Sequence, residues 1–579
     1  MATNHQSKIE NQQSQIGYIV GGGLKESFSA CLTVDPLSVQ EGGFVVIDSG
    51  NYRFYGLVTD LQLGATDPRF ADEQSETRLP PTLAKALHGQ TLYTNLEILP
   101  ALMLERGPEP GTPEYKLWRA EHADTLTGTS DPRPVPVKTV PLHHAPVSLA
   151  DQTDIATIFG DPDKDGNFVI GYTREQGHPV CINLEKFVQR SSGVFGATGT
   201  GKSFLTRLVL AGLMKYDRAS VLVLDMHNEY GFDDVASDTK AKVIGLKSKF
   251  GAKLSVVGLG AGAKIRGANT PDFNLEIAMD DIAPADIEML SRELNLKETT
   301  PVTLGALVSS FGQKNWFASF KEMKYESYTE DPETGKKVPA PDSVEYWARS
   351  AGVNDAAAKA LHSKLSRLFN KHYVVEKPAA DSIKQVIDTL AAGRHVVLSF
   401  GDNESDLDYL LVSNLLTRKI REAWEKRTNE FRSHGGQEPR PLVIVVEEAH
   451  KLLNREMAAQ TAFATIAREL RKYYVTLLIV DQRPSQIYDE VMSQLGTRIS
   501  GWLGDDLDIQ SVLSGLSGRD SLRGMLARLQ PKEEVLLLGW GVPMPLPVRS
   551  RRYDDNFWRE LMGNKGKKGE GEILKELGF

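Results

Sequence analysis

Short runs of strand-forming residues alternate with Gly- and Ser-rich turns in the first third of the chain. The runs lie at residues 17–20, 44–47, 52–58, 168–171 and 180–183. Val, Ile, Phe and Tyr dominate these runs, and such residues favour strands. The pattern predicts a small β-barrel or sandwich over residues 15–188, after a flexible N-terminus at residues 1–14. Prolines crowd part of this region, so we expect a Pro-rich insertion of loops and extended chain at about residues 63–136.

A second pattern begins near residue 189, where continuous apolar strands alternate with helical stretches. The strands are expected at residues 193–195, 221–224, 395–400, 443–446 and 476–480. Apolar runs without alternation indicate strands that are buried on both faces, as in a parallel α/β sheet. We therefore predict an α/β core made of residues 189–261 and 386–550.

A segment with helical periodicity, at residues 262–385, interrupts this core. Apolar residues recur there at spacings of three and four, namely Ile287, Leu290 and Leu294, and then Leu361, Leu365 and Leu368. The spacing predicts a helical insertion. After the core, residues 551–579 are expected to form a C-terminal arm and a Gly- and Lys-rich tail.

The composition is that of a folded, globular protein. The chain has 579 residues, of which 41% are hydrophobic and 25% are charged, and its net charge is −9. This charge argues against a DNA-binding coat over the outer surface, so any contact with nucleic acid is expected in a groove or pore. The two distant cysteines, Cys31 and Cys181, predict neither a disulfide framework nor a zinc site. No apolar run is long enough to span a membrane, so we predict a cytoplasmic protein without a membrane partner.

Residues 196–203, with the sequence GATGTGKS, match the full phosphate-loop pattern. The motif follows the strand at 193–195 and runs into a helical stretch at 204–214, which is the context that the motif requires. Glycines let backbone N–H groups surround a β-phosphate, Lys202 bridges the β- and γ-phosphates, and the Ser203 hydroxyl is a ligand for Mg²⁺. The predicted cofactors are ATP and Mg²⁺. The predicted nucleotide-binding residues of this loop are Gly196, Thr198, Gly199, Thr200, Gly201, Lys202 and Ser203.

Two adjacent carboxylates, Glu447 and Glu448, end the apolar strand at 443–446. The spacing assigns Glu447 to Mg²⁺, through its water shell, and Glu448 to the attacking water, as the general base. The alternative is a solvated helix N-terminus that favours acidic residues.

Polar residues also end two further strands of the predicted sheet. Gln482 follows the strand at 476–480, where a γ-phosphate sensor would lie; the alternative is a turn built on Pro484 and capped by Gln482. Asp225 ends the strand at 221–224, at the edge where α/β sheets bind ligands, and we include it among the nucleotide-binding residues. Spacing alone does not decide the individual roles within Asp225–Tyr230.

Three arginines are candidates for a catalytic contact across a subunit interface. In a helix expected at 458–472, the apolar face carries Ala459, Phe463, Ile466 and Leu470. Arg468 lies on the opposite face and Arg471 at the margin, and Arg190 precedes the phosphate-loop strand. An arginine finger supplied by a neighbouring subunit would stabilise charge at the γ-phosphate. For each arginine, a solvated or structural role is the alternative.

Taken together, the motifs GATGTGKS, LDMHNEYG, VVEEAH and LRKYYVTLLIVDQRPSQI resemble the HerA family of bacterial and archaeal ATPases, relatives of the FtsK DNA pumps. The N-terminal IGYIVGGG, the helical insertion and the final PVRSRR arm are also similar to that family. The resemblance implies a RecA-like P-loop NTPase core with a helical-bundle insertion and an N-terminal β-barrel. It also implies a homo-oligomer, a hexameric ring with double-stranded DNA in a central channel.

The resemblance gives family roles to Lys202, Ser203, Glu447, Glu448 and Gln482, and it makes Arg190 and Arg471 the preferred arginine fingers. Two features depart from the family pattern. Asp481 stands before Gln482 where a small or hydroxyl residue is usual, and the Pro-rich insertion at 63–136 is longer than expected, so it is a candidate docking surface.

The leading hypothesis is an ATP-driven double-stranded DNA translocase that works with a nuclease or a sirtuin-like effector, in DNA end processing or anti-phage defence. The alternative is a ring-shaped scaffold whose ATP site regulates the assembly or activity of a bound effector without translocation. A third possibility is an NTPase that acts on RNA or protein, but the 8% of aromatic residues are not interleaved with basic residues as in a single-strand stacking platform.

Overall fold

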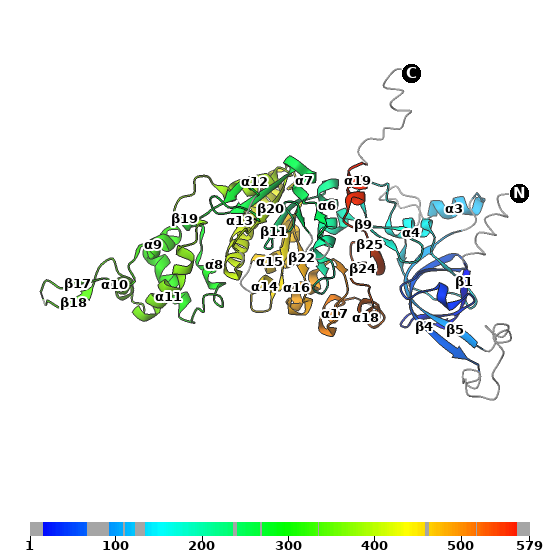
Figure 1. Ribbon diagram of the computed structural model, residues 1–579. Coiled ribbons are helices and arrows are strands. Elements are labelled where there is room, and N and C mark those ends of the chain that lie inside the picture. The colour runs from blue at the N-terminus through cyan, green and yellow to red at the C-terminus, as the bar shows by residue number, and fades with distance from the viewer. Residues whose placement is uncertain are drawn as a thin grey trace, which may run out of the picture. The chain divides into compact units, whose positions relative to one another are not determined.

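The computed structural model describes residues 15–66, 92–107, 111–121, 134–235, 240–266, 269–333, 335–403, 405–457, 462–516 and 518–563. The chain divides into two compact units (Figure 1). The first unit consists of residues 1–184, 196–201 and 497–551, and the second of residues 185–195, 202–496 and 552–579.

The N-terminal strands of the first unit form a closed barrel. They are β1 (Gln15–Gly22), β2 (Phe28–Leu32), β3 (Phe44–Ser49), β4 (Tyr52–Ala65), β5 (Leu92–Glu105) and β7 (Pro146–Leu149), with β6 (Val135–Pro136) paired outside β5. The order is β2-β1-β7-β3-β4-β5, and the pairing of β2 with β5 closes the ring (Figure 1). Val45, Phe54, Leu96 and Val147 are buried in its interior. The sequence pattern left a barrel and a sandwich open, and the structure is a barrel.

The predicted Pro-rich insertion at 63–136 contains a main strand of the barrel, and this corrects the prediction. Strand β5 pairs along its length with β4 and also with β2. Its proline, Pro100, lies at a bulge, because the register passes from the pair Tyr55–Leu102 directly to Gly56–Pro100. A bulge tolerates a residue without an N–H group. The remaining parts of the predicted insertion at 67–91, 108–110 and 122–133 lie outside the described residues.

A helix also lies where extended chain was expected. Helix α3 (Pro113–Glu121) begins with a proline and has Glu114 in its first turn. Proline suits the first helical position because the N–H group that it lacks has no acceptor there, and an acidic residue in the first turn favours the helix dipole. The proline that was taken to indicate extended chain therefore starts a helix.

The rest of the first unit includes helix α4 (Gln152–Phe159) and an antiparallel sheet. Its order is β23 (Thr497–Ser500), β24 (Glu534–Gly539), β25 (Leu546–Ser550), β8 (Asn167–Thr173) and β9 (Pro179–Asn183). Helices α17 (Asp506–Val512) and α18 (Arg519–Ala527) lie between β23 and β24 in sequence. Arg174 ties this sheet to the barrel. It pairs with Glu534 at 2.8 Å and donates to the backbone carbonyl of Glu41 at 2.9 Å.

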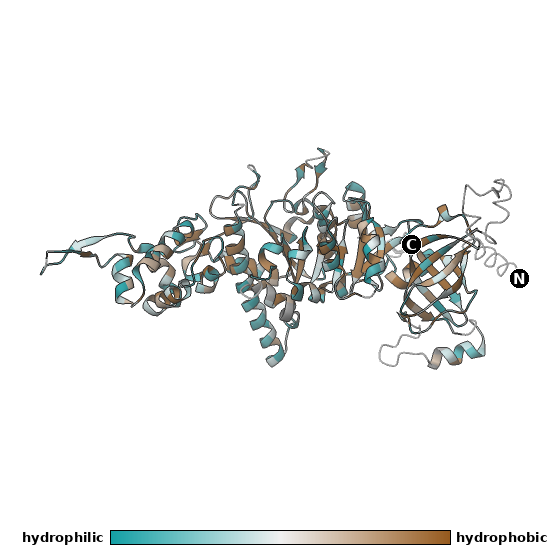
Figure 2. Ribbon diagram, turned by 90° about the horizontal axis from the view of Figure 1, so that it is seen from below, coloured by the Kyte–Doolittle hydropathy of each residue, from teal (hydrophilic) through white to brown (hydrophobic). Residues whose placement is uncertain are grey.

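A parallel sheet forms the centre of the second unit. Its order is β15 (Phe273–Leu275), β14 (Leu254–Leu259), β20 (His395–Ser399), β11 (Ser220–Asp225), β21 (Leu442–Glu447), β22 (Val475–Asp481) and β10 (Ser192–Phe195). Every residue of β11, β20, β21 and β22 is buried, which confirms the predicted two-sided burial. Figure 2 shows these apolar strands in brown between helices that carry polar positions. Because the strands are parallel, their carboxyl ends meet at one edge.

Helices flank this sheet. They include α6 (Lys202–Tyr216), α7 (Leu246–Phe250), α12 (Ser382–Ala391), α13 (Asp406–His434), α14 (His450–Leu453), α15 (Ala462–Glu469), α16 (Asp489–Gln494) and α19 (Asp555–Gly563). The first turn of α13 holds Asp408, which accepts hydrogen bonds from the Tyr373 hydroxyl at 2.5 Å and from the Lys371 Nζ at 2.8 Å. Among the described residues, every helix is too short or too polar to cross a bilayer.

Between β14 and β20, the chain forms a largely helical segment. Its helices are α8 (Pro284–Glu288), α9 (Thr300–Glu322), α10 (Val344–Ser350) and α11 (Asp355–Phe369), and its hairpin is β17 (Tyr328–Glu330) with β18 (Lys337–Pro339) (Figure 1). Leu361, Leu365 and Leu368 are buried on α11, as their spacing predicted. Helix α8 is shorter than predicted: Leu290 and Leu294 are buried in the turns that follow it. The segment also supplies β15, an edge strand of the sheet that the sequence pattern did not predict.

Candidate functional site

The phosphate loop joins the end of β10 to the start of α6. Gly199 and Gly201 have φ angles of 77° and 91°, which side-chain-bearing residues rarely adopt. The space where a Cβ atom of Gly199 would stand is open, with no atom within 4 Å. The Thr200 hydroxyl donates to the carbonyl of Ala197 at 2.7 Å and so braces the loop itself. At the start of α6, the first backbone N–H groups have no acceptor within the helix, and such groups bind phosphate.

Lys202 begins α6, and its half-buried ammonium lies in the field of several carboxylates. Burial lowers the pKa of Lys202, while the negative charges of Glu448 and Asp481 raise it in part. Glu229 and Glu447 contribute in the same direction as those two residues. The lysine therefore faces the strand ends of β21 and β22, where a triphosphate would lie between the cation and the carboxylates.

Glu447, the last residue of β21, is held by two tyrosines. The Tyr230 hydroxyl donates to its Oε1 at 2.7 Å, and the Tyr409 hydroxyl donates to its backbone carbonyl at 2.7 Å. The other carboxylate oxygen, Oε2, is buried and has no hydrogen-bond partner among the residues that the structure describes. Burial, together with the negative charges of Asp225 and Glu229, raises the pKa of Glu447 well above its usual value. An unpartnered buried carboxylate oxygen fits a hydrated cation, because a cation would stabilise the charged form.

Glu448 and Gln482 meet across two neighbouring strands. The Gln482 Nε2 donates to the Glu448 Oε2 at 3.1 Å. Glu448 has a φ angle of 45°, in the left-handed region, which costs of the order of 1 kcal/mol for a residue with a side chain. The strained residue lies at the turn from β21 to α14. The turn therefore costs free energy, and it places the Glu448 carboxylate beside the Gln482 amide.

Asp481 and His450 form a second interacting pair next to Glu448 and Gln482. Asp481 is fully buried and accepts hydrogen bonds from the backbone N–H groups of His450 and Arg483, both at 2.7 Å. The His450 Nδ1 lies 3.0 Å from the Asp481 Oδ2 and 3.7 Å from the Glu448 Oε2. Burial alone would lower the pKa of His450, but its hydrogen bond to Asp481 and the nearby charges outweigh burial and raise it. Asp481, the departure from the family pattern, thus anchors the turn that carries Glu448.

Asp225 holds a turn after β11. Its two carboxylate oxygens accept the backbone N–H groups of Glu229 at 2.8 Å and Tyr230 at 3.0 Å, and the side chain has no exposed surface. Burial raises the pKa of Asp225 to about 6, although these two hydrogen bonds oppose the rise. The geometry gives Asp225 an indirect position, because it fixes the turn that places Tyr230 against Glu447.

Sequence reasoning named most of these residues and missed three of them as site residues. Glu447, Glu448 and Gln482 come together, as their positions at strand ends predicted, and Lys202 at the start of α6 feels the charges of both glutamates. Tyr230 belongs to the segment Asp225–Tyr230, in which spacing did not decide the individual roles. His450 belongs to the motif VVEEAH, and the sequence assigned it no role of its own. Tyr409 has no local sequence signal, because α13 reaches the site only through the tertiary fold.

The three candidate arginines lie outside the strands that end at the carboxylates. Arg190 is half-buried ahead of β10 and packs against Gly496. Arg468 lies in α15, which ends at Glu469, and Arg471 lies in the 3₁₀ turn η5 (Leu470–Tyr473), so the helix predicted at 458–472 ends earlier than expected. Residues 458–461 and the side chains of Arg468 and Arg471 lie outside what the structure describes. Their role in trans remains a prediction.

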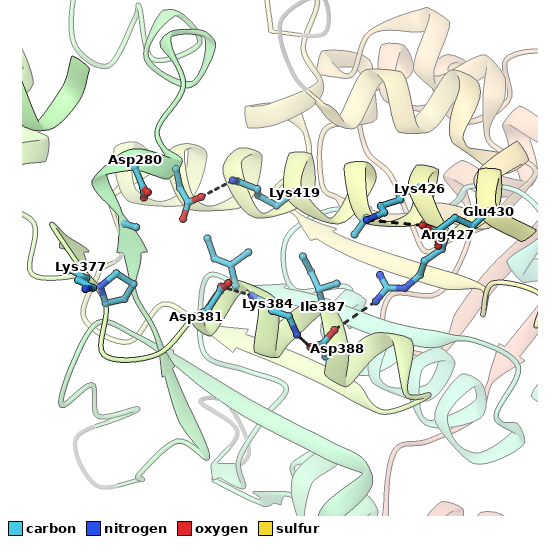
Figure 3. Close-up of a pocket in the computed structure, with 15 residues that line it drawn as sticks. Asp280, Lys377, Asp381, Lys384, Ile387, Asp388, Lys419, Lys426, Arg427 and Glu430 are labelled. Carbon is cyan, nitrogen blue, oxygen red and sulfur yellow. Dashed lines mark hydrogen bonds and ion pairs between the residues drawn. The ribbon is translucent and has the colours of Figure 1, made fainter. Parts of the chain in front are cut away.

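A groove of about 700 Å³ lies elsewhere in the second unit, between α12 and α13 (Figure 3). Five cationic and five acidic side chains line it, and many of them pair with one another. Lys419 pairs with Asp281 at 2.5 Å, and Arg427 lies 3.6 Å from Asp388. The balanced charge distinguishes this groove from the phosphate loop, and no predicted site residue lines it.

Comparisons with known proteins give one consistent family. Residues 168–420 match the model described as "Helicase HerA, central domain". The chain is 22% identical over 553 residues to the DNA double-strand break repair helicase HerA of Saccharolobus solfataricus, with 95% of this chain and 94% of that protein covered. It is 23% identical over 547 residues to the protein of the same name from Sulfurisphaera tokodaii, with 93% of each chain covered.

Two solved structures match this chain at lower sequence identity. VirB4 of Thermoanaerobacter pseudethanolicus matches with a TM-score of 0.42 and 14% identity, over 68% of this chain and 99% of that one. The bacterial conjugative coupling protein TrwB, lacking its first 70 residues, matches with a TM-score of 0.43 and 13% identity, over 70% of this chain and 92% of that one.

Proposed function

We propose that this chain, whose residues 168–420 match the central domain of HerA helicases, is a motor that uses ATP hydrolysis to move along double-stranded DNA. The observation that carries the proposal is the contact between Gln482 and Glu448 at the ends of β22 and β21. It joins a candidate phosphate sensor to a candidate general base, beside Lys202. A regulatory site that only binds nucleotide does not need such a pair, whereas repeated hydrolysis does.

The residues divide the chemistry of hydrolysis among them. The backbone of residues 196–201 and the Lys202 ammonium bind the phosphates, and Glu448 orients the attacking water and accepts its proton. Ser203 and the free Oε2 of Glu447 would hold Mg²⁺. Bound there, the ion would neutralise charge on the phosphate oxygens. Gln482 would report the presence of the γ-phosphate to Glu448 through their hydrogen bond.

The proposed assembly follows the family. We propose a hexameric ring with a RecA-like core, a helical-bundle insertion at 262–385 and DNA in a central channel. Arg190, Arg468 or Arg471 would reach the γ-phosphate of the neighbouring subunit. A separate nuclease or sirtuin-like effector would bind the ring, in DNA end processing or anti-phage defence. The net charge of −9 fits a ring whose basic surface is confined to the channel.

The test combines native mass with ATP hydrolysis rates, with and without linear double-stranded DNA. We expect a ring whose hydrolysis is stimulated by DNA. Lys202→Ala should abolish nucleotide binding, and Glu448→Gln should keep the ring and bound ATP but lower kcat by about 10² to 10⁴. Glu298→Gln, at an exposed position in a loop, is the matched control. A ring whose hydrolysis ignores DNA would overturn the motor and support a scaffold regulated by ATP.

A further inference from the structure

Phe204 is an exposed aromatic residue in the first turn of α6. Its side chain is 38% exposed, whereas Leu205 to Met214 are buried. It directly follows Ser203, and its backbone N–H is one of the first of the helix, the groups that lack intrahelical acceptors and bind phosphate. The Phe204 side chain therefore branches from the phosphate-binding backbone. It is not buried in the apolar core that accounts for the residues after it in α6.

A second aromatic ring lies beside it. Tyr553, from the segment before α19, has its ring centroid 6.3 Å from that of Phe204, at an interplanar angle of 51°. The Tyr553 hydroxyl donates to the carbonyl of Ile244 at 2.7 Å, which fixes the ring in place. A segment more than 340 residues away in sequence thus supplies the neighbour of a residue in the phosphate-loop helix.

Arg207 supports the two rings from within the unit. It is 3% exposed, and its guanidinium carbon lies 5.3 Å from the Phe204 ring centroid and 5.9 Å from that of Tyr553. It also donates to the carbonyl of Glu229 at 2.5 Å. A buried guanidinium that packs against aromatic rings attracts their faces and favours one orientation of the rings. The exposed part of Phe204 is thus a rigid surface.

The direction of a bound nucleotide follows from the site. Lys202, Glu447 and Glu448 face the β- and γ-phosphates, so the nucleoside must lie at the opposite end of the triphosphate. We propose that Phe204, with Tyr553 beside it, is the platform on which the nucleobase stacks. This inference rests on the proposed function, because it assigns a further part of the same ATP site. A platform that uses ring faces ranks bases by stacking strength, so purine nucleotides bind more tightly than pyrimidine nucleotides.

The test compares two probes that share the phosphates and differ in the base. Affinities of ADP and of inorganic tripolyphosphate, each with Mg²⁺, are measured by calorimetry on the full chain. Phe204→Ala is expected to lower the affinity for ADP by about 5- to 100-fold and to leave the affinity for tripolyphosphate unchanged. Phe204→Trp should restore ADP binding. Unchanged tripolyphosphate binding also shows that the variant is folded.

Two controls separate the platform from general effects. Tyr346→Ala removes a similarly exposed ring on α10, 46% exposed, and should change neither affinity. Tyr553→Phe keeps the ring and loses the hydrogen bond to Ile244, so it should weaken ADP less than Phe204→Ala does. Equal losses for ADP and tripolyphosphate in Phe204→Ala, or no loss for either, would overturn the platform.

Failure of this inference and failure of the proposed function are distinguishable. Because the binding experiment contains no DNA, a selective loss of ADP supports the platform even if DNA does not stimulate hydrolysis. Conversely, stimulation by DNA with unchanged ADP binding in Phe204→Ala keeps the motor and removes the platform.

Discussion

The Gln482 side chain donates a hydrogen bond to the Glu448 carboxylate across two adjacent strand ends, with 3.1 Å between Nε2 and Oε2. The two residues are 34 positions apart in sequence, and the pairing of β21 with β22 brings them together. In the proposed function, this hydrogen bond joins the sensor of the γ-phosphate to the general base.

Replacing Gln482 should impair hydrolysis more than binding. In Gln482→Ala, the carboxylate loses its positioning donor and the phosphate loses a polar contact, so we expect kcat to fall by roughly 100-fold. The affinity for ADP, which has no γ-phosphate, should stay the same. Steady-state kinetics and calorimetry check this. Gln486→Ala, an exposed glutamine four residues further on, is the control and should retain full activity.

Two tyrosine-to-phenylalanine substitutions should have different effects on the metal requirement. Tyr230→Phe removes the donor to Oε1 of Glu447 and leaves both carboxylate oxygens without a protein partner. We expect several-fold more Mg²⁺ to be needed for half-maximal hydrolysis. Tyr409→Phe removes a donor to the backbone carbonyl of the same residue, which costs stability of about 1 to 3 kcal/mol but not metal affinity.

The Mg²⁺ dependence of hydrolysis and the thermal unfolding of each variant in EDTA separate these effects. Equal Mg²⁺ requirements in the two variants would contradict the assignment of Glu447 to the metal.

Acid should destabilise the fold through His395. This residue begins β20 and has no exposed surface, and within the described part of the chain neither ring nitrogen has a hydrogen-bond partner. Burial, followed by the positive charge of Arg440, lowers its pKa from 6.5 to about 4. The unfolded chain therefore binds more protons than the folded one between those pH values. Neutral, buried His395 contributes fully to the stability of the fold above about pH 6.5, and this contribution is lost as the pH falls toward 4.

The loss amounts to about 3 kcal/mol at full protonation. Denaturant unfolding of His395→Leu between pH 4 and 7 is the measurement, and its dependence on pH should be flatter than that of the unchanged protein. An identical dependence in both proteins would mean that other groups carry the acid sensitivity.

The ion pair between Arg174 and Glu534 should matter for stability because both side chains are nearly buried, at 11% and 12% exposed. Arg174→Met leaves the glutamate without its cation, and we expect a loss of about 3 to 5 kcal/mol. Arg349→Met breaks an ion pair of an arginine that is 59% exposed, and it should cost less than about 1 kcal/mol. Thermal unfolding of both variants makes the comparison, and equal losses would contradict it.

Local sequence patterns predict those parts of this fold in which burial requires a run or a period of apolar residues. Strands β21 and β22 are continuous apolar runs because both faces are covered, so their ends, and hence Glu447 and Gln482, could be located in advance. Strand β5 fell inside the predicted insertion because prolines crowd the neighbouring chain, and only its pairing with β4 reveals the strand and the bulge that accommodates Pro100.

The contacts that complete the site are not local. Tyr230 reaches Glu447 from 217 positions away, and Tyr409 reaches it from a helix that begins in a different part of the chain. No spacing rule connects such residues, because the connection is made by the order of strands in the sheet.

The first turn of α13 contacts two parts of the second unit. Asp408 is bound by Lys371 and Tyr373, at the end of the segment that carries α9 to α11, and the next residue, Tyr409, is bound to the backbone of Glu447. Two consecutive residues of one turn therefore contact both the helical segment and the end of β21. Because the two residues are neighbours in the chain, a shift of this turn would alter both contacts.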